Sequence, residues 1–132
     1  MGNNIVKIDP AVLALIRGAF GKGGLPMPFT KEIFLIETHI AGTSHINLDE
    51  IEPSLSDDDI LVFKRDAENK HDELAIRIYT KDGQNIGFVP RDNNEILAHL
   101  MDAGKLIFGK LISKEWQGTW LYLQIKVFMR EL

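Results

Sequence analysis

Short stretches of alternating apolar and polar residues dominate the hydrophobic pattern of this chain. A period of two is typical of β-strands, whose successive side chains point to opposite faces of a sheet. We predict six strands, at residues 32–42, 57–65, 74–80, 85–90, 105–116 and 120–129. The last two flank a Gln-Gly-Thr turn, so they predict a β-hairpin near the C-terminus.

A helical period of about 3.6 residues occurs in two other places. Residues 91–105 predict a helix that Asn93 or Asn94 caps and that Gly104 ends. Asp9 and Pro10 suit the start of a shorter helix over residues 9–19, which a Gly- and Pro-rich loop separates from the first strand. One further helical turn is predicted within the irregular stretch before the second strand.

The order of these elements favours an antiparallel fold over a parallel one. Strands and helices do not alternate as they do in parallel βαβ units, and a closed antiparallel barrel removes exposed sheet edges. We therefore expect a mainly β fold with flanking helices, built as a small antiparallel β-barrel of about six strands. Residues 1–30 are expected to form an N-terminal helix and tether, and residues 31–132 the domain itself.

Composition narrows the class of protein further. A chain of 132 residues fits one domain, and the absence of cysteine excludes disulfides and thiolate metal sites, which favours a cytoplasmic location. No apolar run reaches the roughly 18 residues of a transmembrane helix, so no membrane is expected as a partner. The formal net charge of −4 argues against a protein that coats duplex DNA through bulk electrostatics.

The connection between the second and third strands is highly polar. Tight hairpins favour Asn-Gly or Asp-Gly, whereas residues 66–73 contain no glycine or proline and several charged side chains. This composition predicts a loop whose surface binds a ligand.

Two motifs around this loop resemble those of the HIRAN domain family. The pattern Arg-Asp-x-x-Asn-x-x-Asp-x-x-Ala-Ile begins at Arg65, and a Gly-x-x-Pro-Arg segment begins at Gly87. Upstream, the stretch Ile-Ala-Gly-Thr-Ser-His-Ile resembles the first motif of the family, and the likeness covers about residues 33–128. The sequence departs from the family at His45 and His71, where Tyr is usual, and at Ala67, where Pro is usual.

The resemblance implies an OB-like barrel that binds single-stranded DNA and recognises a free 3′-hydroxyl end. It further implies a freestanding bacterial protein in a DNA repair or replication context, with no enzymatic activity, no cofactor and no metal. The expected partners are single-stranded DNA or DNA 3′ ends, with other DNA-processing proteins as further candidates.

A strand end presents a base, a phosphate and a hydroxyl, and the resemblance supplies a candidate for each. The rings of His45 and His71 are candidates for base stacking, and Asp72 for accepting a hydrogen bond from the hydroxyl. Lys70 and Arg91 are candidates for the phosphate. The full set of candidate nucleic-acid-binding residues is Ser44, His45, Arg65, Asn69, Lys70, His71, Asp72 and Arg91.

Several of these residues also suit purely structural roles. Asn69 and Asp72 are typical of turns in which the side chain bonds its own backbone. Arg65 suits an ion pair with Asp66 or Asp72 that braces the loop. Trp116 and Trp120, beside the last turn, suit hairpin packing better than base stacking.

Other functions remain open from the sequence. A protein-interaction or regulatory domain without nucleic-acid binding is the main alternative, and the acidic net charge motivates it. A metal-dependent nuclease that uses Asp66, Glu68 and Asp72 is a weak alternative, as is a hydrolase built on Ser44, because no nucleophile-elbow motif is present. The four histidines show no zinc-binding spacing.

Overall fold

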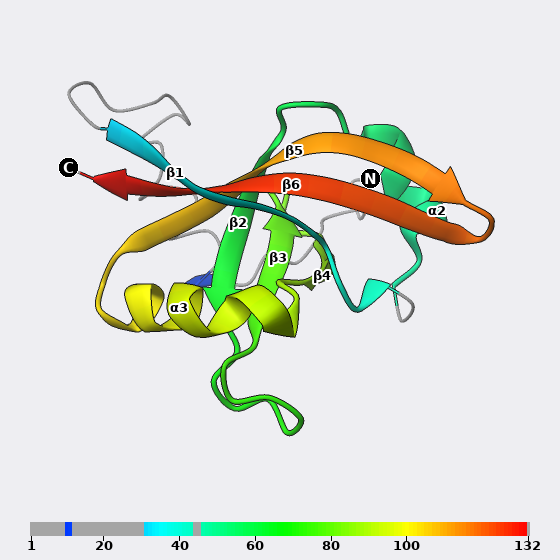
Figure 1. Ribbon diagram of the computed structural model, residues 1–132. Helices are drawn as coiled ribbons and strands as arrows, with labels where there is room; N and C mark the ends of the chain where they lie inside the picture. The colour runs from blue at the N-terminus through cyan, green and yellow to red at the C-terminus, as the bar shows by residue number, and fades with distance from the viewer. Residues whose placement is uncertain (1–9, 12–30, 44–45, 132) are drawn as a thin grey trace.

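One antiparallel sheet forms most of the molecule. The computed structural model describes residues 10–11, 31–43 and 46–131, and the predicted helix over 9–19 falls almost entirely outside them. The strands are β1 (Lys31–His39), β2 (Ile60–Arg65), β3 (Ile76–Thr80), β4 (Asn85–Phe88), β5 (Leu106–Gln117) and β6 (Trp120–Glu131), in the order β1-β6-β5-β2-β3-β4. All six predicted strands are confirmed, and the sheet curls into a half-barrel (Figure 1).

The two edge strands meet through a short seam. The residue Ala41, just after β1, forms an isolated antiparallel bridge with Phe88 of β4. The two N–H···O bonds of this bridge measure 2.8 and 2.9 Å. Because β1 and β4 are the outer strands of the sheet, the bridge draws the sheet toward a closed barrel, as the sequence pattern predicts.

Helices cover the inner side of the curled sheet. The short helices α2 (Leu48–Ile51) and η3 (Glu52–Ser54) form the predicted single turn, and α3 (Arg91–Asp102) is the predicted longer helix. Leu48, Leu97 and Ala98 from these helices join the apolar core, which also contains the inward-facing residues of the strands. Within the described residues, no helix is long and apolar enough to cross a membrane.

The start of α3 differs from the sequence prediction. Pro90 occupies the N-cap position, and neither predicted asparagine caps the helix. The Asn93 amide oxygen instead accepts a hydrogen bond from Thr38 Oγ1 at 2.8 Å, and Asn94 is buried and donates to Asp72. The predicted end is confirmed, because Gly104 follows the last turn with a φ of +90°.

Candidate nucleic-acid interface

The loop between β2 and β3 is held at its base by Arg65. This guanidinium donates to the carboxylate of Asp102 on α3 at 2.9 Å, and to the backbone oxygens of Ala75 at 2.8 Å and Glu73 at 3.0 Å. The predicted bracing role of Arg65 is therefore present, but the predicted carboxylate partners were wrong. The distant Asp102 is the partner because α3 folds back beside the end of β2.

Asn69 shapes the middle of the loop. Its Oδ1 accepts hydrogen bonds from the backbone N–H groups of His71 at 2.9 Å and Asp72 at 3.1 Å. Its Nδ2 donates to Asp66 Oδ2 at 3.0 Å, and Arg77 Nε donates to the same oxygen at 3.0 Å. These donors, Asn69 first, hold the pKa of Asp66 below its ordinary value. The predicted turn-forming role of Asn69 is thus confirmed.

Asp72 is held by hydrogen bonds on both carboxylate oxygens. Oδ1 accepts from the backbone N–H of Leu74 at 2.9 Å, which confirms the predicted turn, and Oδ2 accepts from the Asn94 amide at 2.7 Å. The Arg91 guanidinium approaches Oδ2 to 3.7 Å. The Leu74 bond above all, followed by Asn94 and Arg91, holds the pKa of Asp72 below its ordinary value, so the group is an anion at neutral pH.

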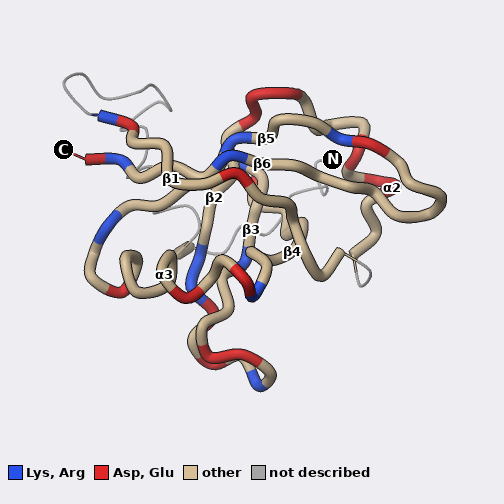
Figure 2. The backbone as a smooth tube through the Cα atoms, viewed as in Figure 1, with Lys and Arg blue, Asp and Glu red and all other residues tan. Residues whose placement is uncertain are grey.

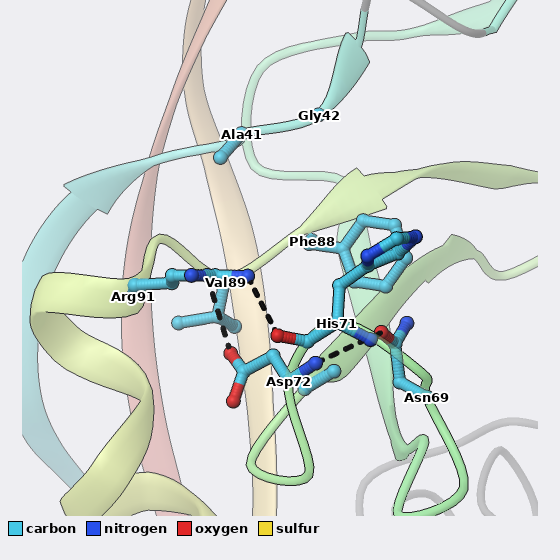
Figure 3. A pocket seen from close by; sticks show the side chains of 9 residues that line it. Ala41, Gly42, Asn69, His71, Asp72, Phe88, Val89 and Arg91 are labelled. Atoms are coloured by element: carbon cyan, nitrogen blue, oxygen red, sulfur yellow. Dashed lines mark hydrogen bonds and ion pairs between the residues drawn. The ribbon is translucent and has the colours of Figure 1, made fainter.

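A cleft of about 390 Å³ opens beside this loop. It is lined by Ala41, Gly42, Asn69, His71, Asp72, Ala75, Phe88, Val89 and Arg91. Figure 3 places the rings of His71 and Phe88 toward one end and the charged groups of Asp72 and Arg91 toward the other. The cleft therefore offers flat apolar surfaces and a pair of opposite charges within one cavity.

Arg91 keeps much of its side chain in solvent. It is 70% exposed, although its guanidinium donates a hydrogen bond of 2.9 Å to the backbone oxygen of His71. A guanidinium has five N–H donors, so most of them remain available to an anion in the cleft. The exposed Arg91 guanidinium lies next to the Asp72 carboxylate, so the cleft can contact both a negatively charged group and a hydrogen-bond donor of a ligand.

Phe88 is a cleft residue that the sequence reasoning missed. Its ring is half-buried beside Gly42, where a Cβ atom would lie 3.0 Å from the ring, and the Arg77 guanidinium lies 4.9 Å from the ring centroid. The preceding Gly87 has a φ of +139°, and a Cβ there would lie 2.5 Å from the backbone oxygen of Ala41. Only glycine therefore fits at the seam, which gives Gly87 of the predicted motif a physical role.

The candidate residues fall into three groups. Asn69, His71, Asp72 and Arg91 come together in the cleft, as their shared motif led us to expect. Arg65 and Lys70 do not line it, because Arg65 is turned toward α3 and Lys70 is exposed in the loop. Ser44 and His45 lie outside the described residues, so their roles stay predictions.

A second hollow of about 280 Å³ lies beside the turn that joins β5 and β6. Trp116 and Trp120 line it, each 42% exposed, and Trp120 Nε1 donates to Thr43 Oγ1 at 3.0 Å. The rings of Trp120 and Tyr122 also meet edge to face, with centroids 5.3 Å apart. These contacts agree with the predicted hairpin packing, although both indole rings keep substantial exposed surface.

The charges around the first cleft are mixed. Figure 2 shows acidic residues along the loop below β2 and β3, with a lysine at its tip. Among the residues that the structure describes, no three His, Asp or Glu side chains gather in a way that could hold a metal ion. The geometry therefore suits recognition of one or two phosphates rather than a long polyanion.

Comparisons with known proteins agree with this fold. The model of the HIRAN domain family matches residues 33–131. The structure is similar to that of a protein from Lactobacillus plantarum, with a TM-score of 0.72 and 20% identity over 78% of this chain and 99% of that one. It is also similar to the HIRAN domain of human HLTF, with a TM-score of 0.58 and 16% identity over 75% of this chain and 78% of that one. No curated protein matches the sequence.

Proposed function

Because the chain belongs to the HIRAN domain family, known as a family of DNA-binding modules, we propose that it binds single-stranded DNA and holds a free 3′-hydroxyl end in the cleft. The observation that carries this proposal is the grouping of an exposed His71 ring, a half-buried Phe88 ring, one hydrogen-bonded carboxylate and one exposed guanidinium in a single cavity. These are the groups that a terminal nucleotide requires.

The two rings bind the terminal base. His71 and Phe88 line the same end of the cleft and offer flat surfaces on which a base can stack, at about 1–3 kcal/mol per base. Stacking does not depend on base identity, because every base has a π-face. We therefore expect little sequence preference at the terminal position.

The charged end of the cleft binds the sugar and phosphate. Asp72 Oδ1 uses one of its lone pairs on the Leu74 N–H and can accept a further hydrogen bond from a 3′-hydroxyl. Arg91 donates to the adjoining phosphate, since most of its guanidinium N–H groups face solvent. A 3′-phosphate would bring a second anion against Asp72, so the same geometry disfavours it.

The test is fluorescence anisotropy with labelled single-stranded oligonucleotides that differ only at the 3′ terminus. The hydroxyl end should bind more tightly than the phosphate end, and Mg²⁺ should cause no cleavage. Equal affinity for both ends would contradict end recognition and leave a general single-strand binder. Absence of binding would favour the protein-interaction alternative, and cleavage in Mg²⁺ would favour the nuclease alternative.

The same site would suit a particular biological setting. Free 3′ ends of DNA arise at breaks, gaps and stalled synthesis, so a module that holds them suits DNA repair or replication. HIRAN is a binding domain, and we propose that this chain acts by binding alone in the cytoplasm, beside the proteins that process the end.

A further inference from the structure

The two tryptophans form separate walls of the hollow beside the β5–β6 turn. In the register of this hairpin Trp116 pairs with the buried Leu121, and Trp120 pairs with Gln117. Register partners point to the same face of a sheet and successive residues to opposite faces, so the two indoles start from opposite faces of the hairpin. Both nevertheless line the same hollow of about 280 Å³. The hollow therefore has an aromatic side chain on two sides.

The Trp120 ring is held in place before any ligand arrives. Its Nε1 donates to Thr43 Oγ1, and one edge of the indole packs against Tyr122. The ring still keeps 42% of its surface exposed. Because its one N–H donor is already used, the open part of the ring offers a ligand its π-face, which carries partial negative charge.

The segments that form the hollow are strongly acidic. Residues 43–52 and 114–121 contain four acidic residues and one basic residue, namely Asp49, Glu50, Glu52, Glu115 and Lys114. Figure 2 shows the acidic residues gathered where α2 meets the end of β5. Asp49 lines the hollow and is exposed, and its carboxylate has no hydrogen bond or ion pair with any residue that the structure describes.

The single basic residue of these segments does not neutralise the hollow. Lys114 forms an ion pair with the carboxylate of Glu52, and its ammonium group donates to the backbone oxygen of Glu52 at 2.9 Å. Lys114 does not line the hollow, whereas the Asp49 carboxylate does. The open π-faces and the carboxylate thus all present negative charge to the same small space.

We propose that this hollow binds an arginine side chain of a partner protein. A cation over the face of an indole is attracted by the ring, and a planar, weakly hydrated guanidinium also stacks on it. Asp49 can accept N–H groups of the same guanidinium. A phosphate group would instead meet the acidic border, so a nucleic-acid strand is the disfavoured occupant.

Size and position agree with a single inserted side chain. Pockets for drug-sized ligands measure about 300–1,000 Å³, and this hollow of about 280 Å³ lies just below that range. The described residues that line it are all different from those that line the cleft of the proposed DNA end. The domain could therefore hold a strand end and a partner protein at the same time.

Tryptophan fluorescence tests this binding, because the chain has two tryptophans and both line the hollow. The full chain is titrated with the peptide Gly-Arg-Gly-Arg-Gly, acetylated and amidated at its ends, and with the same peptide carrying citrulline in place of arginine. Citrulline keeps the planar shape but has no charge. The arginine peptide should bind at least about fivefold more tightly, the factor expected of one cation–π contact. Equal affinities, or no response to either peptide, would overturn the proposal.

Matched variants identify the groups that bind the peptide. Asp49→Asn should weaken binding of the arginine peptide by up to about fivefold, the effect of an exposed ion pair, and leave the citrulline peptide unaffected. Asp82→Asn removes the same charge in the β3–β4 turn, away from the hollow, and should change neither affinity. Trp116→Leu keeps an apolar side chain but removes the π-face, and it should weaken the arginine peptide by about fivefold. Equal effects of Asp49→Asn and Asp82→Asn would contradict a specific site.

Single-stranded DNA is the other occupant that two aromatic rings could attract. Anisotropy titrations with a 3′-hydroxyl oligonucleotide should give the same Kd for Trp116→Leu and for the wild type, since the hollow is separate from the cleft. A weaker oligonucleotide affinity of Trp116→Leu would place the strand in the hollow and overturn the proposal. If the oligonucleotide binds to neither protein, the proposed function fails, whereas the peptide titrations still decide this inference.

Discussion

The buried amide of Asn94 donates a hydrogen bond of 2.7 Å to Oδ2 of Asp72. This contact joins the first turn of α3 to the loop between β2 and β3. It also orients the carboxylate at the edge of the cleft, so that the remaining lone pairs point in a defined direction. The fixed orientation of the Asp72 carboxylate is the basis of its proposed hydrogen bond with a 3′-hydroxyl.

Replacing Asp72 by Asn should invert the preference for the strand end. The variant keeps an oxygen for the Leu74 N–H but loses the charge, so binding of a 3′-hydroxyl end should weaken by about 1.5–3 kcal/mol, the range for a hydrogen bond to a charged group. Binding of a 3′-phosphate end should strengthen, because the repulsion disappears and Arg91 loses its carboxylate neighbour. Anisotropy titrations with both oligonucleotides measure the two changes.

The matched control for this prediction is Asp82→Asn. Asp82 lies in the turn between β3 and β4 and does not line the cleft, yet its replacement removes the same charge. If both variants change affinity by the same amount, the effect is one of net charge, and the specific role of Asp72 is wrong.

Phe88→Ala and His71→Ala should each weaken binding by about 1–3 kcal/mol, the range for one stacked base. The loss should be the same for hydroxyl and phosphate ends, because stacking does not involve the 3′ group. His71→Tyr should bind at least as well as the wild type, since a larger ring covers more of the base. Phe34→Ala, an exposed Phe away from the cleft, serves as the control, and an unchanged affinity of Phe88→Ala would refute the stacking role.

Binding should depend only weakly on salt. Each phosphate contact on a single strand contributes about −0.7 to the slope of log K against log salt, and one or two contacts give roughly −0.7 to −1.4. Arg91→Gln should reduce the magnitude of the slope by about 0.7, whereas Lys81→Gln, in the β3–β4 turn, should leave it unchanged. A much steeper slope for the wild type would place the binding face elsewhere on the molecule.

Gly87→Ala should destabilise the fold far more than Gly104→Ala. Both glycines have positive φ, +139° and +90°, so each replacement introduces backbone strain of about 1–2 kcal/mol. Only at Gly87 would the added Cβ lie 2.5 Å from the Ala41 oxygen, whereas nothing lies within 4 Å at Gly104. Thermal unfolding of the two variants should differ by several degrees, and equal Tm values would show that the seam adapts easily.

Acid should weaken the loop through Asp66 and Asp72. The pKa values of both carboxyls in the folded state lie below the ordinary 3.8, so the unfolded state binds more protons in this pH range. The two carboxylates therefore stabilise the folded state above about pH 4. This stabilisation is lost as the pH falls through the folded pKa values. Asp66→Asn should therefore lower the Tm at pH 6, and the difference in Tm between the variant and the wild type should shrink toward pH 2. A difference that stays constant with pH would contradict an ionic role for Asp66.

Local patterns in the sequence determined most of the fold. The period of two in six stretches and the glycine after α3 predict elements that depend on residues near one another in the chain, and these elements are confirmed. The family motif likewise identified Asn69, His71, Asp72 and Arg91, which the structure brings to one cleft. The reason is that alternation and turn chemistry act over a few residues and are visible without tertiary contacts.

Only the tertiary structure decided which partners these side chains meet. Simple alternation would put Phe88 on the same side as the buried Ile86, but a register shift between β3 and β4 pairs Phe88 with Arg77 and turns its ring to the cleft. Asn94 looked like a helix cap and is instead the buried partner of Asp72, 22 residues away. Register shifts and contacts between distant segments depend on how the whole sheet closes, and no local pattern encodes them.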